Sequence, residues 1–517
     1  MSRPIRSVAV IGAGASGESH RSRLHAFHEL TSLAGAAAAA ALSAEQCVDT
    51  IRVFERRGTP GGTGLDPGAR EPPSPGALAP RLDPPSDVPT HLPAVSPPVN
   101  RERWDKTPVY EDLTTNVPAI AMSFSDCPFS YGPFVPHWIP KQNVQEYFAR
   151  QRTDRLLVPD TTVEDVAKLP HERWALTLRR YDAVADVDRW WREDFDALII
   201  ANGHYSVPFV PFVPGLEDYL TAFPGKVMHS KIFRTPTAFA GKRVLVIGNS
   251  ASGHDITTAL TATARLPVYV SRRSRSRWDY SEPPAGVAWR PVIERYCADT
   301  GSITFTDGTV LAAGCIDTVI YCTGYQASFP FWNGAANGGA LWDYTHQRLD
   351  GNYLRTFFHD HPTLGIVGMP RTLTFRSFEY QAIALARVFA RRNRVELPSR
   401  GQMQNWEAQR AEACRARRMK FHDIPWEKGE AMEFLQVLYE IAGLPTLDGA
   451  GKCPPVLDEA TRWAVEHIRK YPEPGLDDLA CSSHGHGVGS ACTPCEVDDG
   501  DWVVVAGQRS RGLQVLP

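Results

Sequence analysis

Two stretches of the chain combine apolar runs with glycine turns in the order expected of a βαβ unit. The first starts with the apolar run at 8–11 (VAVI), passes through a glycine turn into alanine-rich sequence, and ends in IRVFERR at 51–57. The second spans 242–271, where KRVLVIGNSASGHDI leads to PVYV. An apolar run followed by a turn, a helix-forming stretch and a second apolar run predicts strand, helix and strand. Two such units are therefore predicted in one chain.

Further elements follow from the same patterning. Apolar positions at helical spacing predict helices, and β-rich runs predict strands; the helices are expected at 141–152, 377–392 and 405–420, and the strands at 174–181, 195–203 and 315–325. Prolines crowd residues 66–100, which excludes regular helix or central strand there. Composition leaves open whether this stretch is a linker or an extended excursion over the surface. Apolar periodicity fades after residue 455, so a flexible C-terminal tail is expected at 456–517.

The composition of the chain limits the general class of protein and the partners to be expected, but it does not indicate a specific function. The chain has 517 residues, of which 43% are hydrophobic and 22% charged, which is ordinary for a globular protein of two or more domains. Its net charge of -3 gives no reason to expect nucleic acid or an anionic membrane as a partner. Ten cysteines and no recognisable signal peptide indicate reduced thiols. We expect a cytoplasmic protein without a membrane anchor.

The first glycine turn has the spacing of a dinucleotide-binding site. Its first glycine permits a tight turn, the second lets backbone approach a pyrophosphate, and the third lets the helix pack on the strand. The phosphates then lie at the helix N-terminus. Glu55, at the end of the next strand, is placed to accept hydrogen bonds from a ribose hydroxyl. The candidate residues of the turn are Gly12, Ala13, Gly14, Ala15, Ser16 and Gly17.

An interruption follows this turn. The acidic residue is expected about 20 residues beyond the last glycine, yet Glu55 lies 38 residues beyond Gly17. Removing residues 18–32 (ESHRSRLHAFHELTS) would let the turn run directly into the alanine-rich helix. We therefore predict an insertion at 18–32, which is either a real loop or an artefact of how the coding sequence was assembled. It lies where the phosphates should bind, so an inactive protein is one alternative.

The second turn differs in its chemistry. Its strand ends at Ser271 and Arg272, and no carboxylate stands there. Hydroxyl and guanidinium donors suit a ribose 2′-phosphate, which an acidic side chain would repel. The first site therefore suits FAD and the second NADPH, which together imply electron transfer from nicotinamide to flavin. Ser250 should hold the pyrophosphate less tightly than a glycine would. The turn comprises Gly248, Asn249, Ser250, Ala251, Ser252 and Gly253.

Residues 223–233 (FPGKVMHSKIF) fit F-x-G-x-x-x-H-x-x-x-[Y/F], and the chain thereby resembles the flavin-containing monooxygenase family, in particular its fungal-type members. PVYEDLTTNVP at 108–118 resembles the family's threonine–asparagine segment, and FEYQA at 378–382 its glutamate-x-glutamine helix. In this pattern His229 is expected to be structural or to bridge the domains. The resemblance departs at Gly64, where the family usually has Trp, and at Asn202, where Thr is common. The residues it places beside the flavin are Gly62, Thr115, Asn116 and Gln381.

This resemblance implies an α/β fold of two Rossmann-like domains, with the NADP domain inserted in the FAD domain. We expect the FAD domain at 1–205 and 316–455 and the NADP domain at 206–315. The implied reaction uses NADPH and O2 to oxygenate a soft nitrogen or sulfur of a small molecule through a C4a-hydroperoxyflavin. Asn116 is the expected catalytic hydrogen-bond donor.

Three other possibilities remain. A Baeyer–Villiger monooxygenase uses both nucleotides, but its fingerprint closes on Trp rather than Phe233. A disulfide reductase needs a Cys-x-x-C close after a nucleotide turn, and the pair here lies in the tail. Zinc could bind there, but the surrounding Gly and Ser favour a flexible tail and no metal site; the residues concerned are Cys481, His484, His486, Cys492 and Cys495. Partners other than substrate and O2 are not indicated, apart from a possible homodimer.

Overall fold

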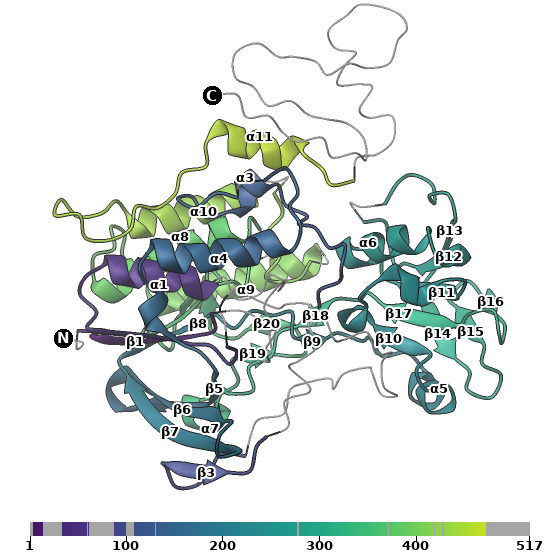
Figure 1. Ribbon diagram of the computed structural model, residues 1–517. Helices are drawn as coiled ribbons and strands as arrows, with labels where there is room; N and C mark the ends of the chain where they lie inside the picture. The colour runs from purple at the N-terminus through teal and green to yellow at the C-terminus, as the bar shows by residue number, and fades with distance from the viewer. Residues whose placement is uncertain are drawn as a thin grey trace, which may run out of the picture.

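The computed structural model describes residues 4–13, 34–58, 60, 87–99, 108–129, 131–276, 279–370, 372–417, 419–426 and 429–471. Figure 1 shows a larger body, which contains α1, α4, α8 and α10, and a smaller body around α6 and β11. Each body is built on its own sheet, and both sheets have a parallel core.

The larger body contains a seven-stranded sheet. Five neighbouring strands are parallel, and β21 and β22 extend the sheet in the antiparallel sense. The predicted strand–helix–strand unit is present, because α1 (Ala34–Ala44) follows β1 and precedes β2. In sheet order the strands are β21 (Asn352–Tyr353), β22 (Phe357–Phe358), β23 (Leu364–Ile366), β8 (Ala197–Ile200), β1 (Ser7–Ile11), β2 (Thr50–Phe54) and β4 (Leu157–Val158).

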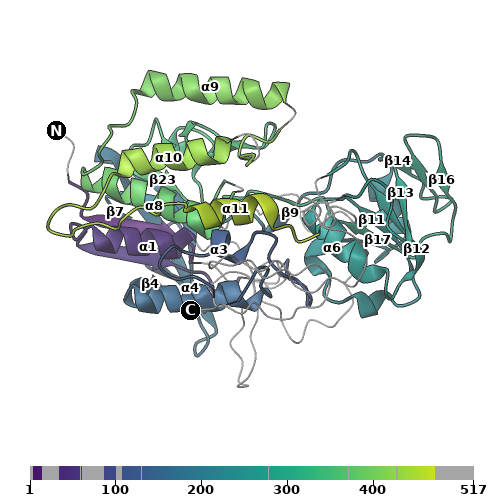
Figure 2. The same cartoon turned by 90° about the horizontal axis from the view of Figure 1, so that it is seen from above.

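Both faces of this sheet are covered, which explains why β1 is apolar throughout rather than alternating. Val8 and Val10 belong to a core shared with the helices, whereas Ala9 and Ile11 pack toward an antiparallel sheet on the other face. That second layer consists of β3 (Ala94–Ser96), β7 (Val187–Phe195), β6 (Arg173–Asp182) and β5 (Thr161–Leu169). The helical layer includes α1, α3 (Ala119–Met122), α4 (Trp138–Arg150), α8 (Phe375–Ala390), α9 (Arg400–Ala416) and α10 (Glu430–Ala442) (Figure 2).

The smaller body contains the second predicted unit. Its five strands are all parallel, and α6 (Ala251–Leu260) connects β11 to β12. Val244 and Val246 of β11 pack with Ile256 and Leu260 of α6, while Leu245 faces the opposite core. In sheet order the strands are β10 (Val227–His229), β17 (Thr318–Tyr321), β11 (Arg243–Ile247), β12 (Arg265–Ser271) and β13 (Val287–Arg290). The opposite core includes α5 (Leu216–Ala222), β14 (Ile293–Tyr296), β15 (Ile303–Phe305) and β16 (Val310–Leu311).

The smaller body is inserted in the larger one, as predicted. The first sheet contains both β8 and β23, and all strands of the second sheet lie between them in the chain. The chain passes between the bodies at β9 (Val207–Pro208) and β18 (Tyr325–Gln326), which pair with each other. The expected domain boundary at 316 is wrong, because β17 hydrogen-bonds with β10 and β11 inside the second sheet. Short elements after β18 are α7 (Gly334–Asn337), β19 (Trp342–Asp343) and β20 (Arg348–Leu349).

The proline-rich stretch at 66–100 and the predicted tail at 456–517 each contain a regular element in their described part. Of residues 66–100, the part at 87–99 is described, and it includes β3, which forms an edge strand beside β7. Residues 456–471 were assigned to the flexible tail, but they include α11 (Glu459–His467), which packs on α3. Asp458 caps this helix by accepting a hydrogen bond from Thr461 N. Along the described part of the chain, no helix has both the length and the apolar character needed to cross a bilayer.

Candidate functional site

The first candidate site begins where β1 ends. Gly12 has a φ of 101°, and a Cβ atom there would lie 2.6 Å from Ala201 O, so a side chain is excluded on both counts. Its N–H donates to Phe54 O at 2.8 Å, and the next N–H, of Ala13, donates to Glu55 Oε2 at 2.9 Å. Of the other residues expected here, Gly14, Ala15, Ser16, Gly17, Gly62 and the insertion at 18–32 lie outside the described residues.

Glu55 lies directly beyond β2, at the carboxyl edge of the sheet beside the turn. It is 4% exposed, and its Oε1 accepts a hydrogen bond from Arg57 N at 3.1 Å. Burial raises the pKa of this carboxyl, an effect that the charges of Arg57 and Arg56 oppose. A carboxylate buried at this edge suits the two hydroxyls of an unphosphorylated ribose, which can supply further hydrogen bonds to it. The residues present therefore fit the adenosine half of FAD.

Gln381 of α8 forms hydrogen bonds that hold the backbone segment packed next to α1. It is fully buried; its Oε1 accepts from Gly368 N at 3.1 Å, and its Nε2 donates to Arg355 O and Thr356 Oγ1 at 2.9 and 3.0 Å. Gly368 has a φ of 100°, and a Cβ there would lie 3.2 Å from the Cβ of Ala34, the first residue of α1. Gln381 thus holds the segment that packs on this end of α1. Its predicted place beside the flavin stays a prediction.

The threonine–asparagine segment lies just before α3. Thr115 is buried and pairs with Val135 twice, because its N–H donates to Val135 O and its Oγ1 accepts from Val135 N. Asn116, the next residue, is exposed. The segment is therefore held by its threonine, and the asparagine side chain remains accessible to a ligand. A catalytic role for Asn116 stays a prediction.

The second candidate site repeats the geometry of the first. Gly248 has a φ of 104°, and a Cβ there would lie 2.6 Å from Cys322 O. Gly253, three residues into α6, would place a Cβ 2.0 Å from Gly248 O. Ser250 is the exposed N-cap residue, and Ala251 and Ser252 begin the helix. The N–H groups of this first turn have no carbonyl partners within the helix, which is the arrangement that binds an anion.

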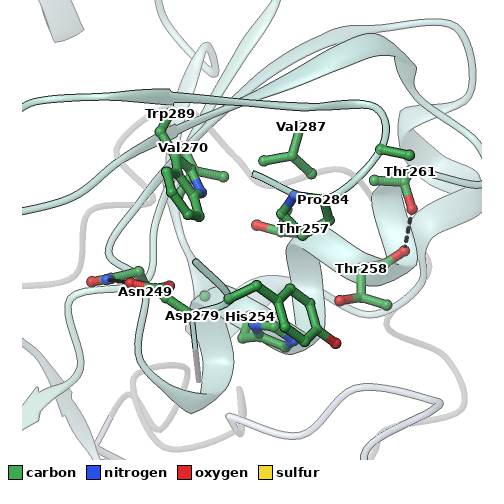
Figure 3. Close-up of a pocket in the computed structure, with 13 residues that line it drawn as sticks. Asn249, His254, Thr257, Thr258, Thr261, Val270, Asp279, Pro284, Val287 and Trp289 are labelled. Atoms are coloured by element: carbon green, nitrogen blue, oxygen red, sulfur yellow. Dashed lines mark hydrogen bonds between the residues drawn. The ribbon is translucent and has the colours of Figure 1, made fainter. Parts of the chain in front are cut away.

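A cavity of about 120 Å³ opens beside this turn (Figure 3). One wall consists of polar residues of α6, and the other comes from β12, β13 and the loop between them. The α6 wall includes His254, Thr257, Thr258 and the C-cap residue Thr261, and the opposite wall includes Val270, Asp279, Pro284, Val287 and Trp289. The combination of a helix N-terminus and a partly apolar pocket suits a nucleotide.

Arg272, directly after β12, contacts two of the residues that line this cavity, Trp289 and Asp279. Its guanidinium stacks on the indole of Trp289, 3.3 Å from the ring centroid, and Nη1 lies 3.0 Å from Asp279 Oδ2. Asp279 also accepts hydrogen bonds from Asn249 Nδ2 at 2.5 Å and Ser276 N at 2.9 Å. Sequence reasoning missed Asp279 and Trp289, because both lie in or beyond a loop that no spacing rule connects to β12.

Ser271 is placed differently from the expectation. It is 3% exposed, and its hydroxyl donates to Pro291 O at 2.8 Å. The expectation that this hydroxyl faces a phosphate is wrong for this conformation, because the side chain is buried and already hydrogen-bonded. Of the pair, Arg272 is the residue that contacts the cavity lining, through Trp289 and Asp279.

The fingerprint at 223–233 connects the two bodies. His229 is fully buried; Nδ1 accepts from Lys231 N at 3.1 Å, so Nε2 carries the proton and donates to Gly324 O at 3.0 Å. Burial lowers the pKa of His229 to about 4, which keeps the ring neutral. Phe233 is buried against Tyr110, with ring centroids 5.7 Å apart. These contacts agree with a structural role for His229, and its role as a bridge between the domains stays a prediction.

Asp255 of α6 joins three segments that are distant in sequence. It accepts hydrogen bonds from Tyr110 Oη at 2.7 Å, Tyr471 Oη at 2.6 Å and Lys470 Nζ at 2.9 Å. Lys470 Nζ also donates to Thr114 O at 3.2 Å, within the threonine–asparagine segment. Residues 468–471, here called the C-terminal strap, therefore connect the larger body to α6. Sequence reasoning missed this contact because it assigned the strap to the tail.

Comparison with known proteins agrees with this geometry. Residues 100–282 match the family model described as flavin-binding monooxygenase-like. The chain is 29% identical to flavin-containing monooxygenase iboF of Amanita muscaria over 458 residues, which cover 76% of this chain and 80% of that protein. It is 31% identical to FMO GS-OX5 of Arabidopsis thaliana over 313 residues, covering 57% of this chain and 63% of that relative.

A third sequence relative and two solved structures complete the comparison. FMO GS-OX-like 4 of A. thaliana is 30% identical over 424 residues, which cover 77% of this chain and 79% of the relative. S-allyl-L-cysteine S-oxygenase from Allium sativum has a TM-score of 0.66 at 23% identity, covering 92% of this chain and 97% of its own. Tmm from Pelagibacter sp. strain HTCC7211 has a TM-score of 0.64 at 21% identity, with 89% of each chain covered. At these identities the two structures show a shared fold, while the sequence relatives show that this chain belongs to the flavin-containing monooxygenase family.

Proposed function

We propose that this flavin monooxygenase binds FAD at the first turn and NADPH at the second, and that it oxygenates a soft nitrogen or sulfur atom of a small molecule. The proposal assigns FAD to the larger body. It assigns NADPH to the body that lies between β9 and β18, which keeps the expected start at 206 and moves the expected boundary at 316 beyond β17.

The contrast between the two strand ends is the observation that supports this assignment. Where β2 ends, Glu55 presents a buried carboxylate next to the turn, which would repel a 2′-phosphate. Where β12 ends, Arg272 presents a guanidinium over the ring of Trp289, and the nearby carboxylate of Asp279 is ion-paired with it. A guanidinium in this position can donate two parallel hydrogen bonds to a phosphate. The phosphorylated adenosine therefore fits the second site and the unphosphorylated one the first.

In the proposed reaction, each of the described site residues has a separate role. FAD, when bound, supplies the activation of O2 with electrons taken from NADPH. Gly12 permits the tight turn that would carry the chain past the pyrophosphate of FAD, and Glu55 would hold its ribose. Thr115 fixes the segment from which Asn116 can donate a hydrogen bond to a reacting group. Because the cofactors provide the chemistry, the protein needs no nucleophilic triad; it supplies orientation and exclusion of water.

Absorption and turnover of the purified protein test the proposal. The protein should be yellow, absorb near 450 nm and lose this absorption on anaerobic addition of NADPH, and NADPH should be preferred to NADH. Incubation with amines, thioethers and ketones, followed by mass spectrometry, should yield N- or S-oxides from the first two. Protein that stays colourless after reconstitution with FAD contradicts the enzyme assignment. Esters from ketones without N- or S-oxides would instead support a Baeyer–Villiger enzyme.

The role of Asn116 has a separate test. Asn116→Ala should keep its FAD, because the segment is held by Thr115, but should form less product for each NADPH consumed. Thr115→Val, which removes the hydroxyl that Val135 N uses, serves as a comparison for mere loosening of the segment. If Asn116→Ala forms product as efficiently as the unaltered protein, the residue is not a catalytic donor.

A further inference from the structure

The second residue of α1 is packed against the first glycine turn more closely than any side chain permits. A Cβ atom on Gly35 would lie 2.0 Å from Gly12 O and 3.2 Å from Ala13 Cα. Backbone atoms at such distances cannot move aside as a flexible side chain could, so only glycine fits here. Glycine inside a helix costs about 1 kcal/mol relative to alanine. The close contact with Gly12 O therefore explains why α1 has a glycine at position 35 despite this cost.

The second turn shows the same contact in an uninterrupted sequence. Gly253 would place its Cβ 2.0 Å from Gly248 O, which equals the distance from Gly35 to Gly12 O. The first glycines also match, with φ of 104° and 101° and a Cβ 2.6 Å from a carbonyl oxygen in each case. In the second turn, where Ser250 replaces the second glycine, Gly253 takes the last position of G-x-G-x-x-G. Gly35 occupies the equivalent place in the first.

The spacing along the chain agrees. Gly253 follows Gly248 by 5 residues and Gly35 follows Gly12 by 23, so the first turn contains 18 additional residues (23 − 5 = 18). Counted from Gly35, Glu55 comes 20 residues later (55 − 35 = 20). That is the separation expected between the last glycine and the acidic residue that holds the ribose. Counted from Gly17 the separation is 38, which no uninterrupted βαβ unit of this type requires.

We propose that Gly35, rather than Gly17, is the third glycine of the FAD-binding turn, and that 18 residues, rather than the 15 at 18–32, interrupt it. Removing residues 15–32 leaves GAGLAGAAAA, and removing 18–35 leaves GAGASGAAAA. Both retain G-x-G-x-x-G directly before the alanine helix. The inference rests on the proposed binding of FAD at this turn, and it makes Gly35 a positioning residue that brings α1 onto β1.

Paired substitutions in the full chain test this assignment. Gly35→Val should lower the FAD bound per chain at least tenfold after reconstitution, measured by absorption at 450 nm against protein concentration. Gly17→Val, the matched control, should change it less than twofold. A loss of FAD in Gly17→Val, whether or not Gly35→Val also loses it, would overturn the assignment.

Deletions decide the question if Gly35→Val does not fold. Chains lacking 15–32 or 18–35 should fold, as judged by circular dichroism, and bind FAD at least as well as the full chain. A folded deletion variant that binds less FAD than the full chain would overturn the proposal. These readouts need neither NADPH nor substrate. Yellow protein that oxygenates nothing would therefore refute the proposed reaction while leaving the assignment of Gly35 in place.

Discussion

Replacing Arg272 by alanine should remove most of the preference for NADPH over NADH. A charge-assisted hydrogen bond contributes about 1.5–3 kcal/mol, and each 1.4 kcal/mol corresponds to about tenfold in affinity. Loss of the guanidinium should therefore raise the KM for NADPH about 10- to 150-fold. Asp279 lies 3.0 Å from Arg272 Nη1 and offsets part of its charge, so the effect should fall in the lower part of this range.

The assay compares kcat/KM for the two nucleotides in one preparation, by the absorption decrease at 340 nm. NADH has no 2′-phosphate, so its KM should change less than about threefold. Arg273→Ala is the matched control, because that arginine is exposed and follows in sequence. Asp279→Asn should act in the opposite direction and increase the preference for NADPH, since it removes a carboxylate near the phosphate. An Arg272→Ala variant that keeps the NADPH preference of the unaltered protein would refute our interpretation of the second site.

Three other variants test separate parts of the structure. Glu55→Gln should bind FAD less tightly, yet it should raise the unfolding temperature of the apoprotein at pH 7. Burial raises the pKa of Glu55, so the stabilising contribution of this carboxyl is present below its ordinary pKa of 4.5 and is lost as pH rises through the folded-state pKa. A variant that is less stable than the unaltered apoprotein at pH 7 would contradict this reasoning. His229→Ala should reduce the change in the free energy of unfolding between neutral and acidic pH by roughly 3 kcal/mol, measured by urea denaturation. The reason is that a histidine whose pKa is lowered to about 4 stabilises the fold above pH 6.5, and this contribution is lost as pH falls through 4. An unchanged pH profile would mean that His229 is not buried in solution. Asp255→Asn should lower the free energy of unfolding by about 1–3 kcal/mol. It should also expose the C-terminal strap to limited proteolysis while the FAD content stays the same. Resistance to proteolysis equal to that of the unaltered chain would show that Asp255 does not hold the strap.

The features that local sequence predicted correctly are those encoded within one βαβ unit. The apolar runs, the turn glycines Gly12 and Gly248, and the position of Glu55 after β2 all follow from short-range rules of strand, turn and helix. The fingerprint around His229 was equally informative, because its spacing encodes a fixed local turn. These residues could be placed before any tertiary contact was known.

Tertiary structure decided where segments distant in sequence meet. Strand β17 belongs to the second sheet because it pairs with β10 and β11. Asp279 and Trp289 surround Arg272 because a loop folds back over the end of β12, whereas Ser271 turns inward to Pro291. The C-terminal strap reaches Asp255 although nothing in its composition indicates order. Gly35 also needed the structure, since only the approach of α1 to β1 shows which glycine must lack a side chain. The physical reason is the same in each case: short-range patterns determine the conformation of a segment, whereas its partners depend on how all the segments pack together.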